Sequence, residues 1–346
     1  MTNYDKEIVE KVSRVTLADD LKERSRNVKC YYNGCGSKPI YSHSIQEALL
    51  KTTIGKSGYV YMQTIQSIAE NIRNDSEVMF SKVPTTRSGV FEGFCGDING
   101  LSHDSNLFKS IEIEEEVQKT TIEDYIFKYA YRALVYQIWL VSTLASPMSD
   151  RGVAKAKKNP VVDERVLQSF LSLTSSNLGL VDNLQRLYDL KTKIEKYIKT
   201  DGEISGNIFE TFNLKFVELN DWKLEFAGIG AKIFPNSKYP ICYGLVPSQY
   251  NKPDLFFWVS SKEDILDDNF LDELLYVNKT YSIQNLVALS GNIMLSEELY
   301  QSLKSSENEE LDKLKEFISP IPNNKRYDQY DLIRDNGFRL FRTLID

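Results

Sequence analysis

Cysteine, histidine and long apolar runs are all scarce in this chain. Its 346 residues include four Cys and two His. The most hydrophobic window, residues 126 to 145, contains Lys128 and Arg132, and a charge near the centre of a bilayer costs about 2.5 to 3.5 kcal/mol. The first residues, MTNYDKEIVEKVSR, are polar and do not indicate a secretory signal. We therefore expect a cytoplasmic protein without a membrane partner, in which the apolar window is a buried helix.

The few cysteines and the overall charge also narrow the function. Without a signal peptide, a Cys cluster more often serves metal binding or catalysis than a disulfide framework. The net charge of -7 argues against a protein that coats nucleic acid by electrostatics alone. The acidic excess lies outside the first 110 residues, which carry 14 Lys and Arg against 13 Asp and Glu. This first region is therefore free to approach phosphate groups.

The apolar pattern changes from helical to strand-like and back, which predicts an α+β fold. Thr121 begins TIED, the spacing of a capping box, and opens a helix that reaches about residue 145. A second helical pattern extends from about Asp163 to Lys199, so we expect an antiparallel helix pair. Residues 146 to 161 lie between the two patterns and form the best linker candidate, because they are small, basic and bracketed by prolines.

Four apolar or alternating runs follow residue 206, and the short turns between them predict an antiparallel meander. They are LKFVEL, WKLEFAGIGAKIF, YPICYGLV and DLFFWVS. Cys242 falls in the third run and is most simply a buried small hydrophobe. We expect three regions, namely a zinc-stapled, treble-clef-like Cys/His lobe, a helical region, and an antiparallel sheet with helices. Their expected bounds are 1–115, 116–205 and 206–346.

Both histidines and three of the four cysteines fall within one-fifth of the chain. They are Cys30, Cys35, His43, Cys95 and His103. A structural zinc ion takes four Cys or His ligands, arranged as two pairs from different parts of a fold. Cys30 and Cys35 bracket YYNG and form one pair, and Cys95 and His103 bracket the longer GDINGLS and form the other. We expect one structural Zn²⁺ per chain.

Five candidates exceed the four places around one zinc ion, so two assignments remain open. In the first, Cys30, Cys35, Cys95 and His103 bind the ion and His43 is left over. In the second, His43 replaces His103 as the fourth ligand, and His103 with Asp104 is left for orientation or function. The plain alternative is that these residues are free thiols and surface histidines.

The first assignment is the arrangement of a treble-clef nuclease. In enzymes of the HNH type (His-Me finger), a His on the strand after the knuckle acts as general base. SHSIQ, residues 42 to 46, resembles the strand that carries that His. The resemblance implies that His43 is the catalytic base, and that Asp104, Asn99 or Asn106 holds a divalent ion such as Mg²⁺ or Mn²⁺.

Several motifs together resemble a widespread family of uncharacterised bacterial proteins of similar length. They are CYYNGC, SHSIQ, and GFC followed by SHDSNLF and SIE, with YAYRALVYQ and LVALSGNIMLSEELY further along. The likeness thus spans most of the chain. It implies an HNH-like zinc-binding N-terminal region, and some members of that family are labelled HNH-like or are linked to defence against phage.

Two functions follow as hypotheses. The first is a metal-dependent nuclease that acts on DNA or RNA. The basic residues Lys22, Arg24 and Arg26 can line a phosphate-facing surface or simply be solvated. Tyrosines near the cluster, Tyr41 among them, can stack on bases or pack around the lobe. The second is a non-catalytic binding or sensing protein whose zinc site is only structural and whose C-terminal region recognises a protein partner.

Overall fold

The computed structural model describes most of the chain, with gaps. The described residues are 14–16, 18–26, 29–74, 80–96, 102–145, 153–154, 157–158, 178–234, 237–250, 252–264, 274, 279–318 and 332–342. No helix within these residues has the length and hydrophobicity needed to cross a bilayer. The predicted linker at residues 146 to 161 lies almost entirely outside them, as does the start of the second predicted helix.

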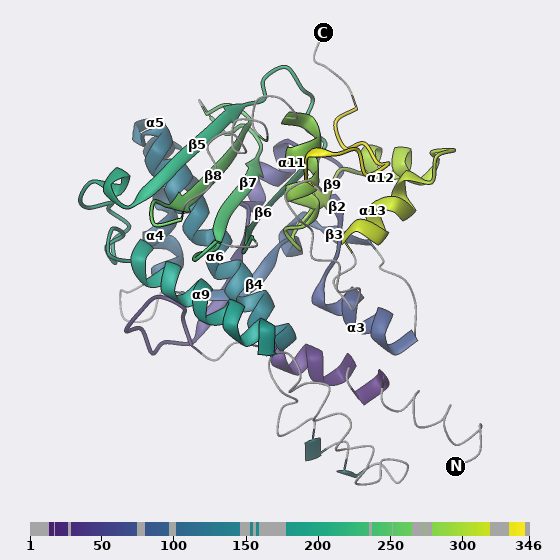
Figure 1. The fold of residues 1–346 in the computed structure, drawn as a ribbon, viewed down its shortest axis with the longest axis horizontal. Helices are drawn as coiled ribbons and strands as arrows, with labels where there is room; N and C mark the ends of the chain where they lie inside the picture. The colour runs from purple at the N-terminus through teal and green to yellow at the C-terminus, as the bar shows by residue number, and fades with distance from the viewer. Residues whose placement is uncertain are drawn as a thin grey trace.

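The α+β prediction is confirmed, and the largest element is an antiparallel sheet of seven strands (Figure 1). Its order is β3-β2-β9-β6-β7-β8-β5. In chain order the strands are β2 (Tyr59–Met62), β3 (Ser81–Pro84), β5 (Phe212–Glu218), β6 (Phe226–Lys232), β7 (Ile241–Val246), β8 (Leu255–Ser261) and β9 (Met294–Leu295). Strands from both ends of the chain therefore share one sheet. The division at residues 115 and 205 stays a prediction.

The expected meander is confirmed for β6, β7 and β8 and is wrong for β5. β6, β7 and β8 are joined in order as antiparallel neighbours, but β5 pairs with β8 and not with β6. Burial explains the difference. Every residue of β7 and β8 is buried, whereas five of the seven residues of β5 are half-buried. Strands covered on both faces suit the middle of a sheet, and the more polar β5 suits its edge.

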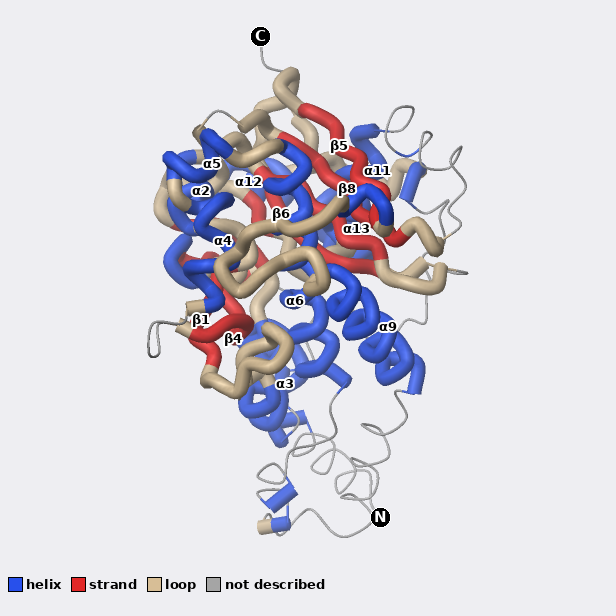
Figure 2. Tube along the Cα trace, turned by 90° about the vertical axis from the view of Figure 1, so that its left-hand side faces the viewer, coloured by secondary structure: helices blue, strands red, loops and turns tan. Residues whose placement is uncertain are grey.

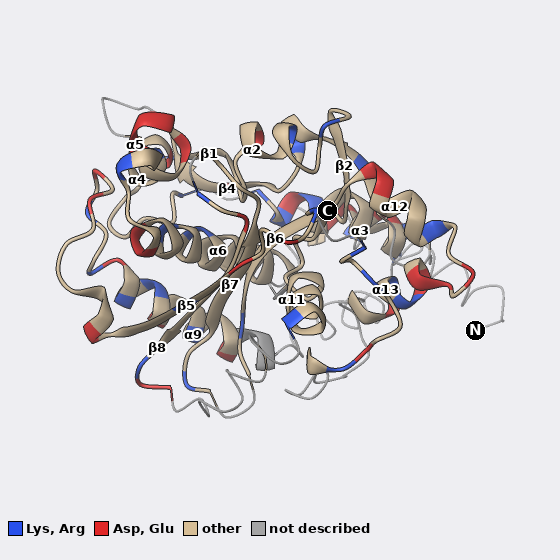
Figure 3. Ribbon diagram, turned by 90° about the horizontal axis from the view of Figure 1, so that it is seen from above, with Lys and Arg blue, Asp and Glu red and all other residues tan. Residues whose placement is uncertain are grey.

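Helices cover both faces of this sheet (Figure 3). The long helix α6 (Ile122–Ala145) packs on one face and α11 (Lys279–Ala288) on the other. Alternate residues of β7 serve the two layers, because Cys242 joins the core under α6 and Tyr243 joins the core under α11. The predicted burial of Cys242 is confirmed. Helix α9 (Leu178–Ile194) packs against α6, as expected for a helix pair (Figure 2).

A second, two-stranded sheet carries the residues of interest. β1 (Pro39–His43) pairs antiparallel with β4 (Val90–Cys95), with Pro39 opposite Cys95 and His43 opposite Val90. Helix α4 (His103–Glu112) follows in the chain and contacts β4. The remaining elements are α2 (Glu47–Thr52), α3 (Ile65–Asn74), η1 (Thr85–Arg87), α5 (Glu114–Lys119), η2 (Ile208–Glu210), α12 (Glu297–Lys304) and α13 (Glu310–Ile318).

Two glycines in the segment after α9 provide a matched test of how tightly that segment packs on α4. Gly202 and Gly206 both have φ +81°. A Cβ on Gly202 would overlap with the backbone oxygen of Asn106 in α4, whereas on Gly206 its nearest neighbour would lie 3.7 Å away. We predict that Gly206→Ala lowers the free energy of unfolding by about 1 kcal/mol. Gly202→Ala should lower it by about 3 kcal/mol or more, because backbone atoms must move. Equal losses in urea unfolding would contradict this packing.

Candidate metal centre

Four of the predicted residues converge from three separate segments. Cys30 and Cys35 lie on a loop before β1, closed by hydrogen bonds from Cys30 N to Ser37 O (2.8 Å) and from Cys35 N to Tyr32 O (3.1 Å). Cys95 is the last residue of β4, and His103 is the first residue of α4. The loop, the end of a strand and the start of a helix therefore meet at one point.

The distances between the four side chains fit a tetrahedral zinc ion. The sulfurs of Cys35 and Cys95 lie 3.8 Å apart. His103 Nδ1 lies 3.2 Å from the sulfur of Cys95 and 3.5 Å from that of Cys30. All four potential ligand atoms lie within 4.8 Å of one another. Ligand distances of about 2.3 Å for sulfur and about 2.0 to 2.1 Å for nitrogen imply edges of about 3.8 Å between sulfurs and about 3.6 Å from sulfur to nitrogen.

Burial sets the protonation states of the side chains in this group. Cys30, Cys95 and His103 are buried, and Cys35 is half-buried. Burial raises the pKa of Cys30 to about 12, although backbone N–H groups of Tyr32 and Cys95 oppose this. Burial also lowers the pKa of His103, so that its imidazole is neutral at pH 7. A neutral imidazole and thiols that lose their protons to a metal are the forms that bind zinc.

The pKa of Cys35 is lowered, in contrast to that of Cys30. Burial raises the pKa of this thiol, but hydrogen bonds from the backbone and side chain of Ser37 and from the other two cysteines outweigh that effect. N–H and O–H groups that donate to sulfur stabilise the thiolate. The hydrogen bonds around Cys35 therefore stabilise the thiolate form of this residue.

Further contacts hold the loop between Cys30 and Cys35 in place, and several of them involve Glu195, the residue after α9. The carboxylate of Glu195 accepts hydrogen bonds from Asn33 N (3.3 Å) and from the hydroxyl of Tyr131 on α6, and it pairs with Lys191 at 2.8 Å. The ring of Tyr32 stacks on the imidazole of His103, with ring centres 4.3 Å apart. Contacts of this kind fix the orientation of metal ligands.

The structure thus brings together the four residues of the first assignment. His43 is not part of this group, so the second assignment does not match the geometry. The lengthened segment between Cys95 and His103 does not separate them, although its residues 97 to 101, with Asn99, lie outside the described part. Asn106 is on α4, two residues from Asp104 and hence on a different face of the helix. Whether the group binds an ion in solution stays a prediction.

His43 belongs to a second, charged group beside the cluster. Asp104 follows His103 on α4 and accepts a hydrogen bond from Ser42. The fully buried Arg132 of α6 interacts electrostatically with both His43 and Asp104. Its guanidinium donates to Glu112 on α4. β1, α4 and α6 each contribute to this group, which we call the His43 group: His43, Asp104, Glu112 and Arg132.

Several atoms of the His43 group are buried without a hydrogen-bond partner among the described residues. They are His43 Nε2, Asp104 Oδ1, and Arg132 Nε and Nη1. Buried polar atoms are otherwise almost always satisfied, by protein or by ordered water. Burial raises the pKa of Asp104, with Arg132 and Ser42 opposing. These atoms are therefore the unsatisfied polar atoms of the His43 group among the described residues.

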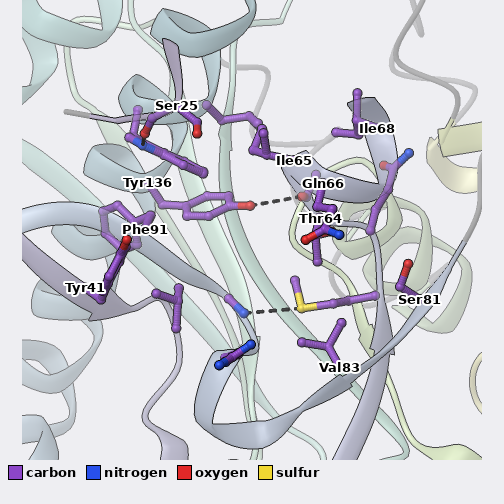
Figure 4. A pocket seen from close by; sticks show the side chains of 18 of the residues that line it. Ser25, Tyr41, Thr64, Ile65, Gln66, Ile68, Ser81, Val83, Phe91 and Tyr136 are labelled. Carbon is purple, nitrogen blue, oxygen red and sulfur yellow. Dashed lines mark hydrogen bonds between the residues drawn. The ribbon is translucent and has the colours of Figure 1, made fainter. Parts of the chain in front are cut away.

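His43 lines a pocket of about 870 Å³ (Figure 4). Strands β1 and β4 supply one wall, and β2, β3 and α3 supply the other. The charged residues of the lining are the cations Lys22, Arg26, Lys82 and Arg87 and the acids Glu70 and Glu92. Pockets of this size are typical of ligand sites.

The sequence patterns did not indicate two residues that contribute to the site, Arg132 and Glu195. Arg132 served there only to argue against a membrane span, yet a charge inside the most apolar helix is itself a signal of a buried interaction. Glu195 had no signal, since nothing local to KIEKYIK connects it with a loop more than 150 residues earlier. Its role depends on how α9 packs against α6.

Comparisons of the chain with protein-family models, with curated proteins and with solved structures found no match. Its functional assignment therefore rests on the geometry of the site.

We predict about one zinc per chain in protein purified without added metal, measured by elemental analysis. Cys95→Ser should lower zinc content strongly because it removes a buried ligand. Cys242→Ser should keep it, since Cys242 is a buried cysteine outside the group. Zinc should also be released as the pH falls, because protons compete for the sulfurs and the imidazole. Wild-type protein without zinc, or equal content in both variants, would contradict the assignment.

Proposed function

We propose that this protein is a metal-dependent nuclease of the HNH-like type, with a structural zinc at the Cys30, Cys35, Cys95 and His103 group and His43 as general base. The observation that supports it most is the order of elements. A Cys-containing knuckle is followed by the paired strands β1 and β4 and then by α4, and His43 ends the first strand. This order resembles that of a treble-clef nuclease finger, with residues 44 to 89 inserted between its strands.

The electrostatic setting of His43 suits a base. Burial lowers its pKa; Arg132 adds to this, while Glu47 and Asp104 oppose it. Its ring also hydrogen-bonds to the backbone of Thr86. Nε2 has no hydrogen-bond partner among the described residues. We assign the proton of the neutral ring to Nδ1, which leaves the lone pair of Nε2 available to accept a proton.

In the proposed reaction a water oxygen forms a bond to phosphorus while the bond from phosphorus to the leaving oxygen breaks. The leaving oxygen departs with the electron pair of that bond and takes a proton from solvent. His43 Nε2 takes the proton that the water loses. Asp104 is the residue that would hold Mg²⁺ or Mn²⁺, since hard cations prefer carboxylate oxygens and its Oδ1 is unpartnered. Such an ion, when bound, stabilises charge that develops on the phosphate. A role in phage defence is proposed on the family resemblance alone.

One observation favours the alternative of a non-catalytic binding or sensing protein. Asp104 already interacts with Arg132 and with Ser42, and Arg132 pairs with Glu112. In this alternative the balanced charges of the His43 group have a purely structural role, which is to join β1, α4 and α6. In that case the zinc site is structural, and the partner is recognised elsewhere, as at the half-exposed edge strand β5.

A His43→Ala variant separates the two functions. We predict that it keeps its zinc and its fold but loses cleavage of DNA or RNA in Mg²⁺ or Mn²⁺ by about a hundredfold or more, the usual contribution of a general base. Gel-based cleavage and zinc analysis on the same preparation measure both. Cleavage at the wild-type rate would exclude His43 as the base, and loss of zinc would make it a ligand.

The pH dependence gives a second test of the base. His43 must be deprotonated to act, so activity should fall as the pH drops through its pKa. Since burial places that pKa below the ordinary value of 6.5, we predict that kcat/KM falls to half of its plateau at a pH below 6.5. A midpoint at or above pH 6.5 would contradict this electrostatic account.

A further inference from the structure

We propose that the pocket beside His43 binds one unpaired strand of nucleic acid, with a base stacked on Tyr41 and phosphates near Lys22 and Arg87. This inference deepens the proposed function and rests on it, because it names the substrate of that same site. Three observations carry it, namely the position of Tyr41, the charge of the lining and the confinement of the pocket.

Tyr41 presents its ring to solvent at the wall of the pocket. Its side chain is 71% exposed, the largest value among the exposed large hydrophobic residues in the described part of the chain. Tyr41 and His43 are two residues apart on β1, so both point to the same face of the strand, whereas Ser42 points inward. Figure 4 shows Tyr41 and Phe91 on one side of the pocket and Gln66 and Ser81 on the other. An exposed aromatic ring beside a reactive residue is suited to base stacking.

The charge of the pocket differs in sign from that of the whole chain. Its lining has four cations and two acids, in a protein with a net charge of -7. Lys82 pairs with Glu297 at 2.8 Å and Arg26 with Glu23 at 3.4 Å. No ion-pair partner of Lys22 or Arg87 is found among the residues that the structure describes. Two cations are thus available for the phosphates of a strand.

The confinement of the pocket favours a single strand over a duplex. A volume of about 870 Å³ corresponds to a ligand of drug size, or about one or two nucleotides. The walls belong to two different sheets, β1 with β4 and β2 with β3, and α6 contributes Tyr136 and Leu140 between them. A base-paired strand would bring its partner strand against these walls. An unpaired strand can instead turn its bases onto aromatic side chains.

Binding can be tested apart from cleavage. Fluorescence anisotropy without added Mg²⁺ or Mn²⁺ would compare a short labelled oligonucleotide as a single strand and as a duplex with its complement. We expect the single strand to bind at least about tenfold more tightly. Tyr41→Ala should weaken single-strand binding roughly 5- to 150-fold, the range for loss of one stacked base. Tyr250→Ala is the matched control, because Tyr250 is 48% exposed and lies outside the pocket lining.

Lys22 and Arg87 are tested with a control of their own. Arg87→Gln should weaken binding of any sequence and reduce the slope of log Kd against log salt by about one, as for loss of a phosphate contact. Lys56→Gln removes an exposed cation of the same region that does not line the pocket, and should leave both quantities unchanged.

The results also separate this inference from the proposed nuclease. Tight single-strand binding without cleavage would remove the nuclease proposal and support the pocket. Equal affinity for strand and duplex, no binding of either, or equal effects of Tyr41→Ala and Tyr250→Ala would overturn the pocket proposal, even if the protein cleaves DNA or RNA.

Discussion

The convergence of three thiols and one imidazole is the constraint on which the site depends. The loop before β1, the end of β4 and the start of α4 join the hydrophobic core under α6, and they also meet at sulfur and nitrogen atoms within 4.8 Å of one another. Three buried or half-buried thiols and an imidazole would carry little stabilisation as neutral groups. A tetrahedral cation would convert them into a cross-link between segments more than 60 residues apart.

Such a cross-link would also restrain the elements next to it. Because Cys95 pairs with Pro39 across the small sheet, fixing the end of β4 also fixes β1 and His43 at its far end. Because His103 begins α4, the same centre aims Asp104 toward Ser42 and Arg132. Helix α6 contributes Tyr136, Trp139 and Leu140 to the pocket, and the segment inserted between β1 and β4 supplies the wall opposite β1 and β4. The strands that carry this group thereby form one side of the pocket.

The sequence predicted the features that depend on local patterns. The α+β class, the long helix from Ile122, the strands after residue 206 and the proximity of Cys30, Cys35, Cys95 and His103 could all be inferred from periodicity or from the scarcity of their residue types. Features that depend on tertiary packing could not. The place of β5 beside β8, the entry of β2 and β3 into the large sheet, and the burial of Arg132 against Glu112 involve partners far away in the chain. No local signal connects such partners.

X-ray absorption at the zinc edge, on the wild-type protein and on the His43→Ala variant, tests the central claim most directly. The account predicts the same spectrum in both, with three sulfur neighbours at about 2.3 Å and one nitrogen at about 2.0 to 2.1 Å. A centre with fewer sulfurs, a spectrum that changes when His43 is removed, or protein that retains no zinc would contradict it.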